Sequence, residues 1–146
     1  EWPSEPLFYA NFTSLTNKET APEGCENGFF LIPIAPDLED TEEVREIYFE
    51  KIISRFEAIT KQSVKENIIF KKSFCVNDFK TEYNSYKGNA YGMANTLLQT
   101  AVLRPKLKSK KVKNLYFTGQ LTVPGPGVPP ALISGKLVAQ LIQKYQ

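Results

Sequence analysis

The sequence predicts a mixed fold of the α+β class, on the basis of three features of its pattern of apolar residues. Two short aromatic and aliphatic runs near the start are typical of paired strands. A long stretch with apolar residues at helical spacing follows them. The last third holds a short apolar run, a turn rich in glycine and proline, and an apolar helix.

The first two strands are expected at Leu7–Phe12 and Phe29–Ile34. The polar segment between them contains Pro22, Gly24 and Gly28, which favour a turn. An antiparallel pair is the simplest arrangement of two strands joined in this way.

A helix is expected from Thr41 to about Lys61. Asp40, followed three residues later by Glu43, resembles a helix N-terminal cap. The apolar residues then recur at helical spacing: Val44, Ile47, Tyr48, Ile52, Phe56 and Ile59. The stretch therefore predicts one amphipathic helix.

A third strand is predicted at Asn67–Cys75 from its content of isoleucine and phenylalanine. The polar, glycine-containing residues 77–92 indicate a loop, or a short helix and then a loop. Residues 95–103 have no clear period, and Pro105 with the lysines after it marks a connection between two structural units.

The end of the chain predicts a strand, a turn and a helix. Val112, Leu115, Tyr116 and Phe117 predict a short buried strand that ends at Gly119, and the Gly/Pro-rich residues 124–127 follow. Pro129 and Pro130 fit the start of a helix, where a missing N–H costs nothing. The apolar residues from Ala131 to Lys144 continue that helix.

The composition excludes several kinds of catalytic site. The chain of 146 residues has no histidine, which removes Ser–His nucleophiles and histidine metal sites, so an enzymatic reaction would need a cofactor. Its two cysteines, Cys25 and Cys75, form no C-x-x-C pair, so we expect no metal site and a reducing compartment, the cytoplasm. The start at Glu1, without a methionine, suggests a piece of a longer chain.

The net charge of +2 hides an acidic stretch at residues 37–50 and a basic run at residues 104–113. Solvated surfaces are the simpler interpretation of both. The alternative for the basic run is attraction to phosphate groups of a lipid or cofactor, and a membrane surface is therefore a candidate partner. Nucleic acid is not expected, because no recognition motif accompanies the charge. No apolar run approaches the roughly 20 residues that span a bilayer, so we expect a soluble or membrane-surface protein.

The turn before the last helix is the candidate binding site. A strand ending at a glycine, a glycine-rich turn and a helix N-terminus leave backbone N–H groups around one crevice, which suits anionic or electron-rich groups. Ala131, Gly135 and Ala139 share one helix face, which allows either a ligand or plain packing to approach closely. No G-x-G-x-x-G motif is present, so the sequence predicts half of a cofactor crevice.

The stretch Asn114–Pro129, NLYFTGQLTVPGPGVP, with the helix that follows, closely resembles the terminal flavin-binding signature of the phytoene dehydrogenase (carotenoid desaturase) family. Residues 88–92 and 95–101, with Arg104–Pro105, resemble the segment that precedes this signature. Residues 21–24 are a weaker match. The resemblance covers nearly the whole chain.

This resemblance implies a carboxy-terminal part of a two-domain flavoprotein that is inactive alone. Residues 1–100 would belong to a substrate-binding domain, and residues 101–146 would complete a Rossmann-type FAD domain. The implied FAD-binding residues are Gly119, Gln120, Val123, Pro124, Gly127, Val128, Pro129, Pro130 and Ala131. No catalytic residue and no metal ligand is implied. Family members often have histidine at the position of Val123 and alanine or an acidic residue at that of Gln120, so side-chain roles are not expected at these two positions.

The implied reaction is desaturation of an apolar isoprenoid polyene, with a hydride passing to FAD and a proton to a base or water. The implied partners are the polyene, the remainder of the parent chain and a membrane surface. Tyr83, Tyr86 and Tyr91 are candidates to line the substrate tunnel or to pack in a core. Two alternatives remain open: a related flavoprotein that isomerises polyenes or saturates a retinoid-like double bond, and a non-catalytic α+β interaction module. The Gly/Pro-rich turn weighs against the module.

Overall fold

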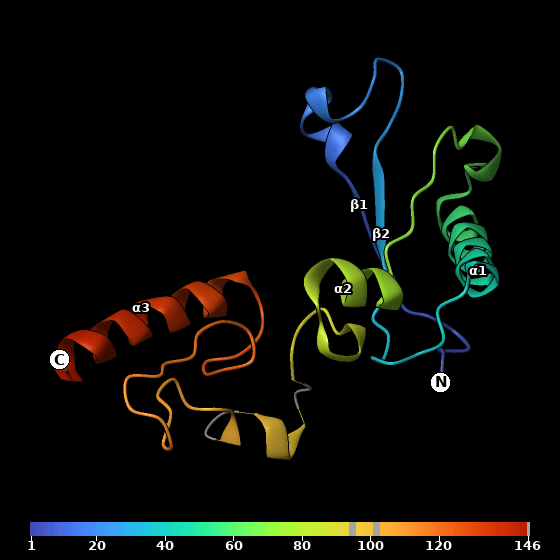
Figure 1. Ribbon diagram of the computed structural model, residues 1–146. Coiled ribbons are helices and arrows are strands. Elements are labelled where there is room, and N and C mark those ends of the chain that lie inside the picture. The colour runs from blue at the N-terminus through green and yellow to red at the C-terminus, as the bar shows by residue number, and fades with distance from the viewer. Residues whose placement is uncertain (94–95, 101–102, 146) are drawn as a thin grey trace. The chain divides into compact units, whose positions relative to one another are not determined.

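The computed structural model describes residues 1–93, 96–100 and 103–145 of the chain (Figure 1). The chain divides into two compact units, Glu1–Asn89 and Ala90–Gln146. The mixture of helices and one antiparallel sheet confirms the predicted α+β class. Asn95 and Ala101, which contribute to the family resemblance, lie outside the described residues.

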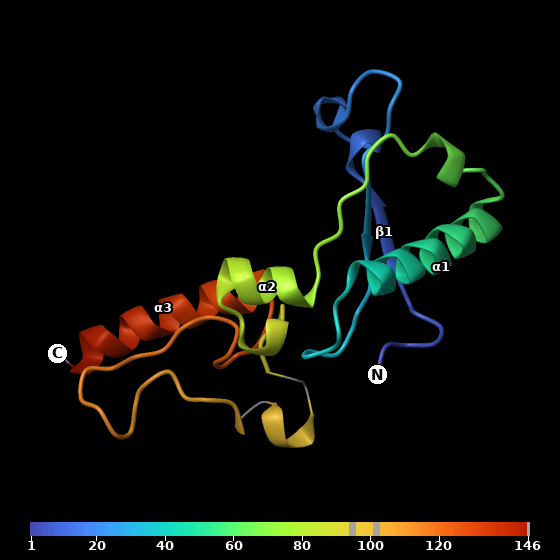
Figure 2. The same ribbon diagram turned by 45° about the vertical axis from the view of Figure 1, so that its right-hand side comes forward.

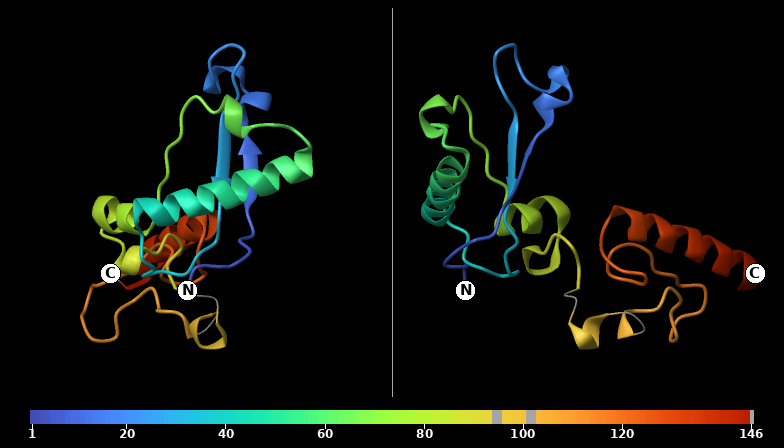
Figure 3. Two further views of the ribbon diagram at one scale, coloured as in Figure 1. Left: turned by 90° about the vertical axis from the view of Figure 1, so that its right-hand side faces the viewer. Right: turned by 180° about the vertical axis from the view of Figure 1, so that it is seen from behind.

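The first unit is built on a hairpin of two strands, β1 (Tyr9–Phe12) and β2 (Gly28–Leu31). They pair antiparallel, with Tyr9 opposite Leu31 and Phe12 opposite Gly28, so the predicted pair is confirmed in a shorter form. Figure 3 shows the helix α1 (Glu42–Thr60) running across this hairpin.

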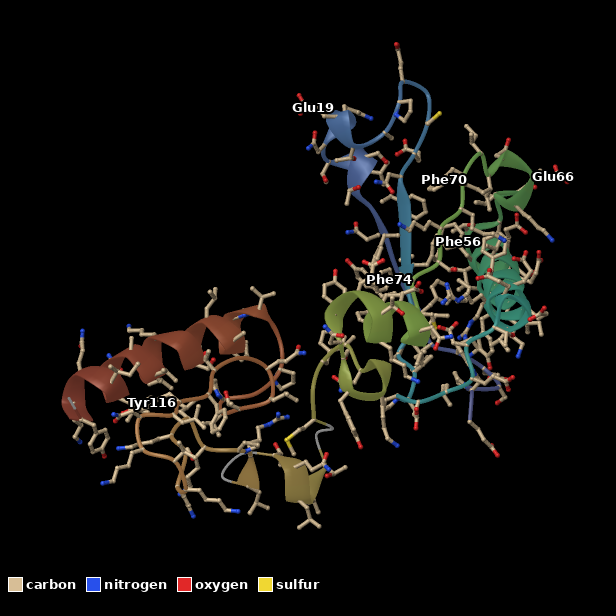
Figure 4. All side chains as sticks on the ribbon, in the orientation of Figure 1. Glu19, Phe56, Glu66, Phe70, Phe74 and Tyr116 are labelled. Atoms are coloured by element: carbon tan, nitrogen blue, oxygen red, sulfur yellow. The ribbon has the colours of Figure 1, made fainter. Side chains whose placement is uncertain are left out.

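A cluster of phenylalanine rings joins the helix to the hairpin. The Phe56 ring of α1 lies 5.6 Å from that of Phe12 and 5.2 Å from that of Phe30, between centroids. Figure 4 labels Phe56 between α1 and β2. Aromatic pairs at these separations contribute about 0.5–1.5 kcal/mol each beyond the area that they bury. The buried side chains of α1 are those of Tyr48, Ile52 and Ile53.

The helix α1 confirms the predicted helix at both ends to within a residue. Its N-cap is Thr41, whose hydroxyl accepts the Val44 N–H at 3.3 Å, and not the predicted Asp40. Glu42 and Glu43 in the first turn complement the helix dipole. The helix ends at Thr60, and its C-cap residue Lys61 adopts a left-handed conformation with φ of 59°.

Asp40 has a different role, which links α1 to α2 (Val76–Tyr83). Its buried carboxylate receives Nε and Nη2 of Arg45 at 2.6 and 2.8 Å and the Asn77 N–H at 2.7 Å. Arg45 also contacts Asp78, at 2.8 Å, and Asp78 accepts the N–H of Cys75. The bond from Arg45 holds the pKa of Asp40 below its ordinary value. This part of the predicted acidic surface is therefore a buried ion pair.

The strand predicted at Asn67–Cys75 is wrong. A 3-10 helix covers Lys65–Asn67, and the chain then runs to α2 without regular structure (Figure 2). A strand needs a neighbour, and within the described residues the sheet consists of β1 and β2 alone. Ile69 is 86% exposed and Phe70, labelled in Figure 4, is 80% exposed.

The polar segment after this run forms the short helix α2 and then a tight loop. Gly88 in that loop has φ of +67°, and a Cβ there would lie 2.4 Å from the carbonyl oxygen of Val76. Only glycine fits this approach. Of the two alternatives predicted for this segment, a loop alone or a short helix and then a loop, the second is confirmed.

The second unit contains α3 (Val128–Tyr145) and a narrow hairpin, residues 107–117. In this hairpin Lys108 pairs with Tyr116, the Phe117 N–H donates to Leu107 at 2.8 Å, and the Ser109 N–H donates to Leu115 at 2.9 Å. The buried strand predicted at residues 112–117 is therefore wrong, and its apolar side chains, except that of Tyr116, are exposed. A buried strand needs partners on both sides, and the described part of this unit offers a single bridge.

The described residues also include single turns of 3-10 helix. They cover Thr13–Leu15, Lys18–Thr20, Tyr86–Gly88 and Leu97–Gln99.

Candidate functional site

The candidate site is the segment between the narrow hairpin and α3, residues 118–127, called here the Gly/Pro turn, with the first turn of α3. All nine residues predicted to bind FAD lie in this one continuous stretch of the second unit. The tyrosines proposed to line a substrate tunnel are divided between the units, because Tyr83 and Tyr86 lie in the first and Tyr91 in the second.

The start of α3 has fewer N–H donors than an ordinary helix. The Ala131 N–H donates to the Gly127 carbonyl at 3.0 Å, which makes Gly127 the N-cap residue. Pro129 and Pro130, in the first turn as predicted, have no N–H. Of the four donors that a helix start normally leaves over, only those of Gly127 and Val128 remain. At the helix start, the predicted set of N–H groups is therefore reduced to two adjacent donors.

Ser134 connects the first part of the Gly/Pro turn to the helix. Its side chain is fully buried, and its hydroxyl donates to the Ala131 carbonyl at 2.6 Å. Because that bond uses its single proton, the hydroxyl must accept from the Thr118 hydroxyl, at 2.8 Å. It also accepts the Gly119 N–H at 2.8 Å.

Thr122 closes the Gly/Pro turn on itself. Its N–H and its hydroxyl both donate to the Gly119 carbonyl, at 3.1 and 2.9 Å. Both polar backbone groups of Gly119 are thus engaged within the protein. Its φ is +101°, and a Cβ there would have nothing within 4 Å, so the open space beside its Cα is what it offers a ligand.

Arg104 supports the middle of the turn. The side chain is 3% exposed, and its Nη1 and Nη2 donate to the carbonyls of Gln120 and Met93 at 3.5 Å each. Arg104 is therefore not part of the solvated basic run to which the sequence assigned it. The exposed members of that run are Lys106, Lys110, Lys111 and Lys113.

Sequence reasoning missed three residues of this site: Thr118, Thr122 and Ser134. A serine inside an apolar helix is the signal that could have revealed one of them, because a buried hydroxyl needs partners. Ser134 lies one turn after Ala131 and faces the Gly/Pro turn. The two threonines carry no comparable signal.

Ionisable groups are absent from this stretch: residues 118–131 contain no charged side chain. Within the described residues, no three carboxylate or thiol side chains gather as metal ligands would. Among those same residues, no helix has the length and apolar content needed to cross a bilayer.

Comparison with known proteins supports the resemblance found in the sequence. No family model matches the chain. The chain is 44% identical over 141 residues to a carotenoid 3,4-desaturase of Haloarcula japonica, an alignment that covers 97% of this chain and 28% of the relative. It is 33% identical over 153 residues to a 4,4'-diapophytoene desaturase (4,4'-diaponeurosporene-forming) of Staphylococcus aureus strain bovine RF122, which covers 96% of this chain and 29% of the relative.

The enzyme of the same name from Staphylococcus aureus strain Newman is 34% identical over 146 residues, with 91% of this chain and 28% of the relative covered. The chain thus spans little more than a quarter of the length of these relatives. Through this similarity, over nearly all of its residues, the chain is homologous to carotenoid desaturases and belongs to their family.

Proposed function

We propose that this chain is the carboxy-terminal part of an FAD-dependent carotenoid desaturase, which introduces double bonds into an apolar isoprenoid polyene. The relatives named for carotenoid and diapophytoene desaturation support the substrate class. The observation that carries the assignment of the flavin site is the Gly/Pro turn, in which Gly119, Gly125 and Gly127 all have positive φ directly before α3.

The Gly/Pro turn fits the flavin ring better than it fits a phosphate group. A phosphate site usually combines several N–H donors with a cationic side chain. Here the first turn of α3 leaves two N–H donors, those of Gly127 and Val128, among neutral and apolar side chains. The guanidinium of Arg104, which lies against the turn, is buried and donates to backbone carbonyls. Open space lies beside Gly119. This donor set suits a flat ring with a polar edge. When bound, FAD would supply the group that accepts a hydride.

In this proposal the chain contributes polarity and shape. The N-terminus of α3 favours negative charge near Gly127 and Val128 by about 0.3–1 kcal/mol. Pro124 and Pro129 restrict the backbone and, with Val123, form an apolar surface that excludes water from the reacting atoms. Residues 118–131 hold no base, so the proton released by the substrate goes to a group outside this stretch or to water.

We further propose that residues 1–100 are part of a substrate-binding domain and that residues 101–146 complete a Rossmann-type FAD domain. The apolar side chains exposed in the first unit, among them Ile69, Phe70, Tyr83 and Tyr86, are suited to contact a polyene or the remainder of the parent chain. We place the protein in the cytoplasm, at a membrane surface that holds the polyene.

The test uses the purified full-length protein, its flavin content and its products. Carotenoid and diapophytoene substrates are supplied in lipid vesicles, and products are separated and weighed by mass spectrometry. Loss of H2 for each turnover supports desaturation. An unchanged mass would indicate an isomerase and a gain of H2 a saturase, and either result would overturn the proposal.

A second experiment titrates FAD against the isolated chain of 146 residues. Because this chain has no G-x-G-x-x-G loop for the pyrophosphate, we expect weak binding or none. Tight stoichiometric binding would contradict the division of the flavin site between this chain and the rest of the protein.

A further inference from the structure

The guanidinium of Arg104 touches three backbone segments of the second unit. It donates to the carbonyls of Met93 and Gln120 at 3.5 Å each. A Cβ on Gly125 would lie 3.5 Å from its Nε and 3.7 Å from its Cζ, so the guanidinium lies against this glycine as well. Gln120 and Gly125 both belong to the Gly/Pro turn. The Arg104 side chain therefore bridges two residues on either side of the middle of this turn.

Other contacts hold the ends of the Gly/Pro turn. Ser134 and Thr122 fix Gly119 at its beginning, and the bond from Ala131 fixes Gly127 at its end. The bonds at Gly119 and at Gly127 do not determine the distance between Gln120 and Gly125. The planar guanidinium can contact both residues at once, whereas an ammonium group donates from a single point.

Arg104 also brings a positive charge to this turn. At 3% exposure the charge is poorly screened by water, and it lies beside a stretch without charged side chains of its own. A cation so placed favours negative charge on a group bound at the turn. Its removal would therefore make such a group harder to reduce.

We propose that Arg104 is a positioning residue for the flavin, and that it acts through the backbone of Gln120 and Gly125. This inference rests on the proposed function. Arg104 would then have two effects. Its planar guanidinium sets the shape of the Gly/Pro turn, and its positive charge raises the reduction potential of the flavin.

The experiment compares Arg104→Met and Arg104→Lys in the full-length protein. The measurements are the dissociation constant of FAD for the apoprotein, the absorption spectrum of the bound flavin and its midpoint potential. Arg104→Met should weaken FAD binding by about tenfold or more, because it removes charge-assisted hydrogen bonds to backbone carbonyls. It should also shift the flavin spectrum and lower the potential.

Arg104→Lys separates the two effects, since lysine keeps the positive charge but lacks the planar guanidinium. We expect Arg104→Lys to bind FAD more weakly than the unchanged protein does, but to lose less affinity than Arg104→Met. Its flavin midpoint potential should stay close to that of the unchanged protein. The control is Arg55→Met, because Arg55 donates to the Pro6 carbonyl at 3.0 Å in the first unit. This variant should leave the spectrum and potential unchanged.

Each outcome decides the question. A variant that melts earlier but binds FAD with unchanged affinity, spectrum and potential shows a purely structural role, and overturns the inference. If Arg104→Met does not fold, Arg104→Lys decides alone, and unchanged binding and spectrum in it overturn the inference. If the unchanged protein binds no FAD, the proposed function fails before the role of Arg104 is reached.

Discussion

The buried hydroxyl of Ser134 accepts a hydrogen bond from the backbone N–H of Gly119, 2.8 Å away. Since the same hydroxyl donates to the Ala131 carbonyl, one atom joins the beginning of the Gly/Pro turn to the first turn of α3, which follows the end of that turn. The conformation of the Gly/Pro turn is therefore tied to a single side chain.

Replacing Ser134 with alanine should destabilise the full-length protein. The change leaves the half-buried Gly119 N–H without its partner, and a buried polar group left unsatisfied costs about 1–3 kcal/mol, whereas the hydroxyl of the exposed Thr118 can bond to water. The measurement is the free energy of unfolding in urea. Ser54→Ala is the control, because Ser54 is an exposed residue within α1 and its loss should change stability little. Equal stability of the two variants would show that the Ser134 bonds are not important.

Gly127→Val should abolish flavin retention in the full-length protein while leaving most of the fold intact. The φ of Gly127 is +106°, a conformation that β-branched residues avoid at a cost of about 1–2 kcal/mol or more. Space is not the obstacle, since a Cβ would lie 3.6 Å from Cδ of Pro130. The strain would instead move the Gly127 and Val128 N–H groups. Absorbance of the purified protein measures the flavin content.

Gly135→Ala is the matched control for that variant. Gly135 lies within α3, and a Cβ there would make an ordinary contact with Thr118, at 3.8 Å. Alanine favours a helix by about 1 kcal/mol over glycine, so this variant should keep its flavin and gain stability. A fully loaded Gly127→Val protein would contradict the proposed role of the turn. Loss of flavin from Gly135→Ala would show that a ligand approaches this face of α3.

Local patterns predicted the elements of this chain that depend on neighbours in sequence. The helix α1 was expected to within a residue because its apolar spacing and first-turn acids are encoded locally. The start of α3 followed from Pro129 and Pro130 for the same reason. Aromatic content also identified β1 and β2.

Predictions that depended on distant partners were wrong. Residues 67–75 and 112–117 have the composition of strands, but strand formation requires a neighbouring edge that a single segment cannot show. Asp40 was interpreted as a cap because its partners Arg45 and Asn77 meet it only in the folded chain. For the same reason, the sequence pattern does not reveal the contacts of Ser134 and Arg104.

Asp40→Asn should destabilise the protein at neutral pH and reduce its sensitivity to acid. The change removes the negative charge that receives Nε and Nη2 of Arg45, and hydrogen bonds to charged groups contribute about 1.5–3 kcal/mol, while Arg45 keeps its contact with Asp78. The pKa of Asp40 is lowered in the folded state, so its stabilising effect is present above the unfolded value of about 3.9 and is lost as the pH falls through the lower, folded value.

The measurement for Asp40 is the free energy of unfolding from neutral pH down to about pH 3. The difference in the free energy of unfolding between the unchanged protein and Asp40→Asn should become smaller at the acid end of that range. Asp37→Asn is the control, because Asp37 forms exposed ion pairs with Lys80 and Lys87 and its loss should matter little. A difference that stays constant with pH would show that the charge of Asp40 does not stabilise the fold.

The basic run should help to hold the full-length protein at anionic membranes, where the proposed polyene substrate would be dissolved. Lys106, Lys110 and Lys111 are exposed, whereas the Lys108 ammonium lies 3.6 Å from the centroid of the Tyr145 ring. Each exposed lysine near an anionic surface contributes about 1 kcal/mol, so several together give measurable binding if they face the lipid. The test is co-sedimentation with anionic vesicles of a variant in which Lys106, Lys108, Lys110 and Lys111 are changed to glutamine.

A second variant of equal net charge provides the control. It changes four exposed lysines elsewhere in the chain to glutamine: Lys18, Lys61, Lys72 and Lys136. We expect the first variant to lose vesicle binding and the control to keep most of it, because attraction to a surface falls off within a Debye length of about 8–10 Å. Raising the salt concentration should release the unchanged protein. If both variants bind as well as the unchanged protein and salt has no effect, the basic run is only a solvated surface, and the contact with lipid is made by apolar side chains.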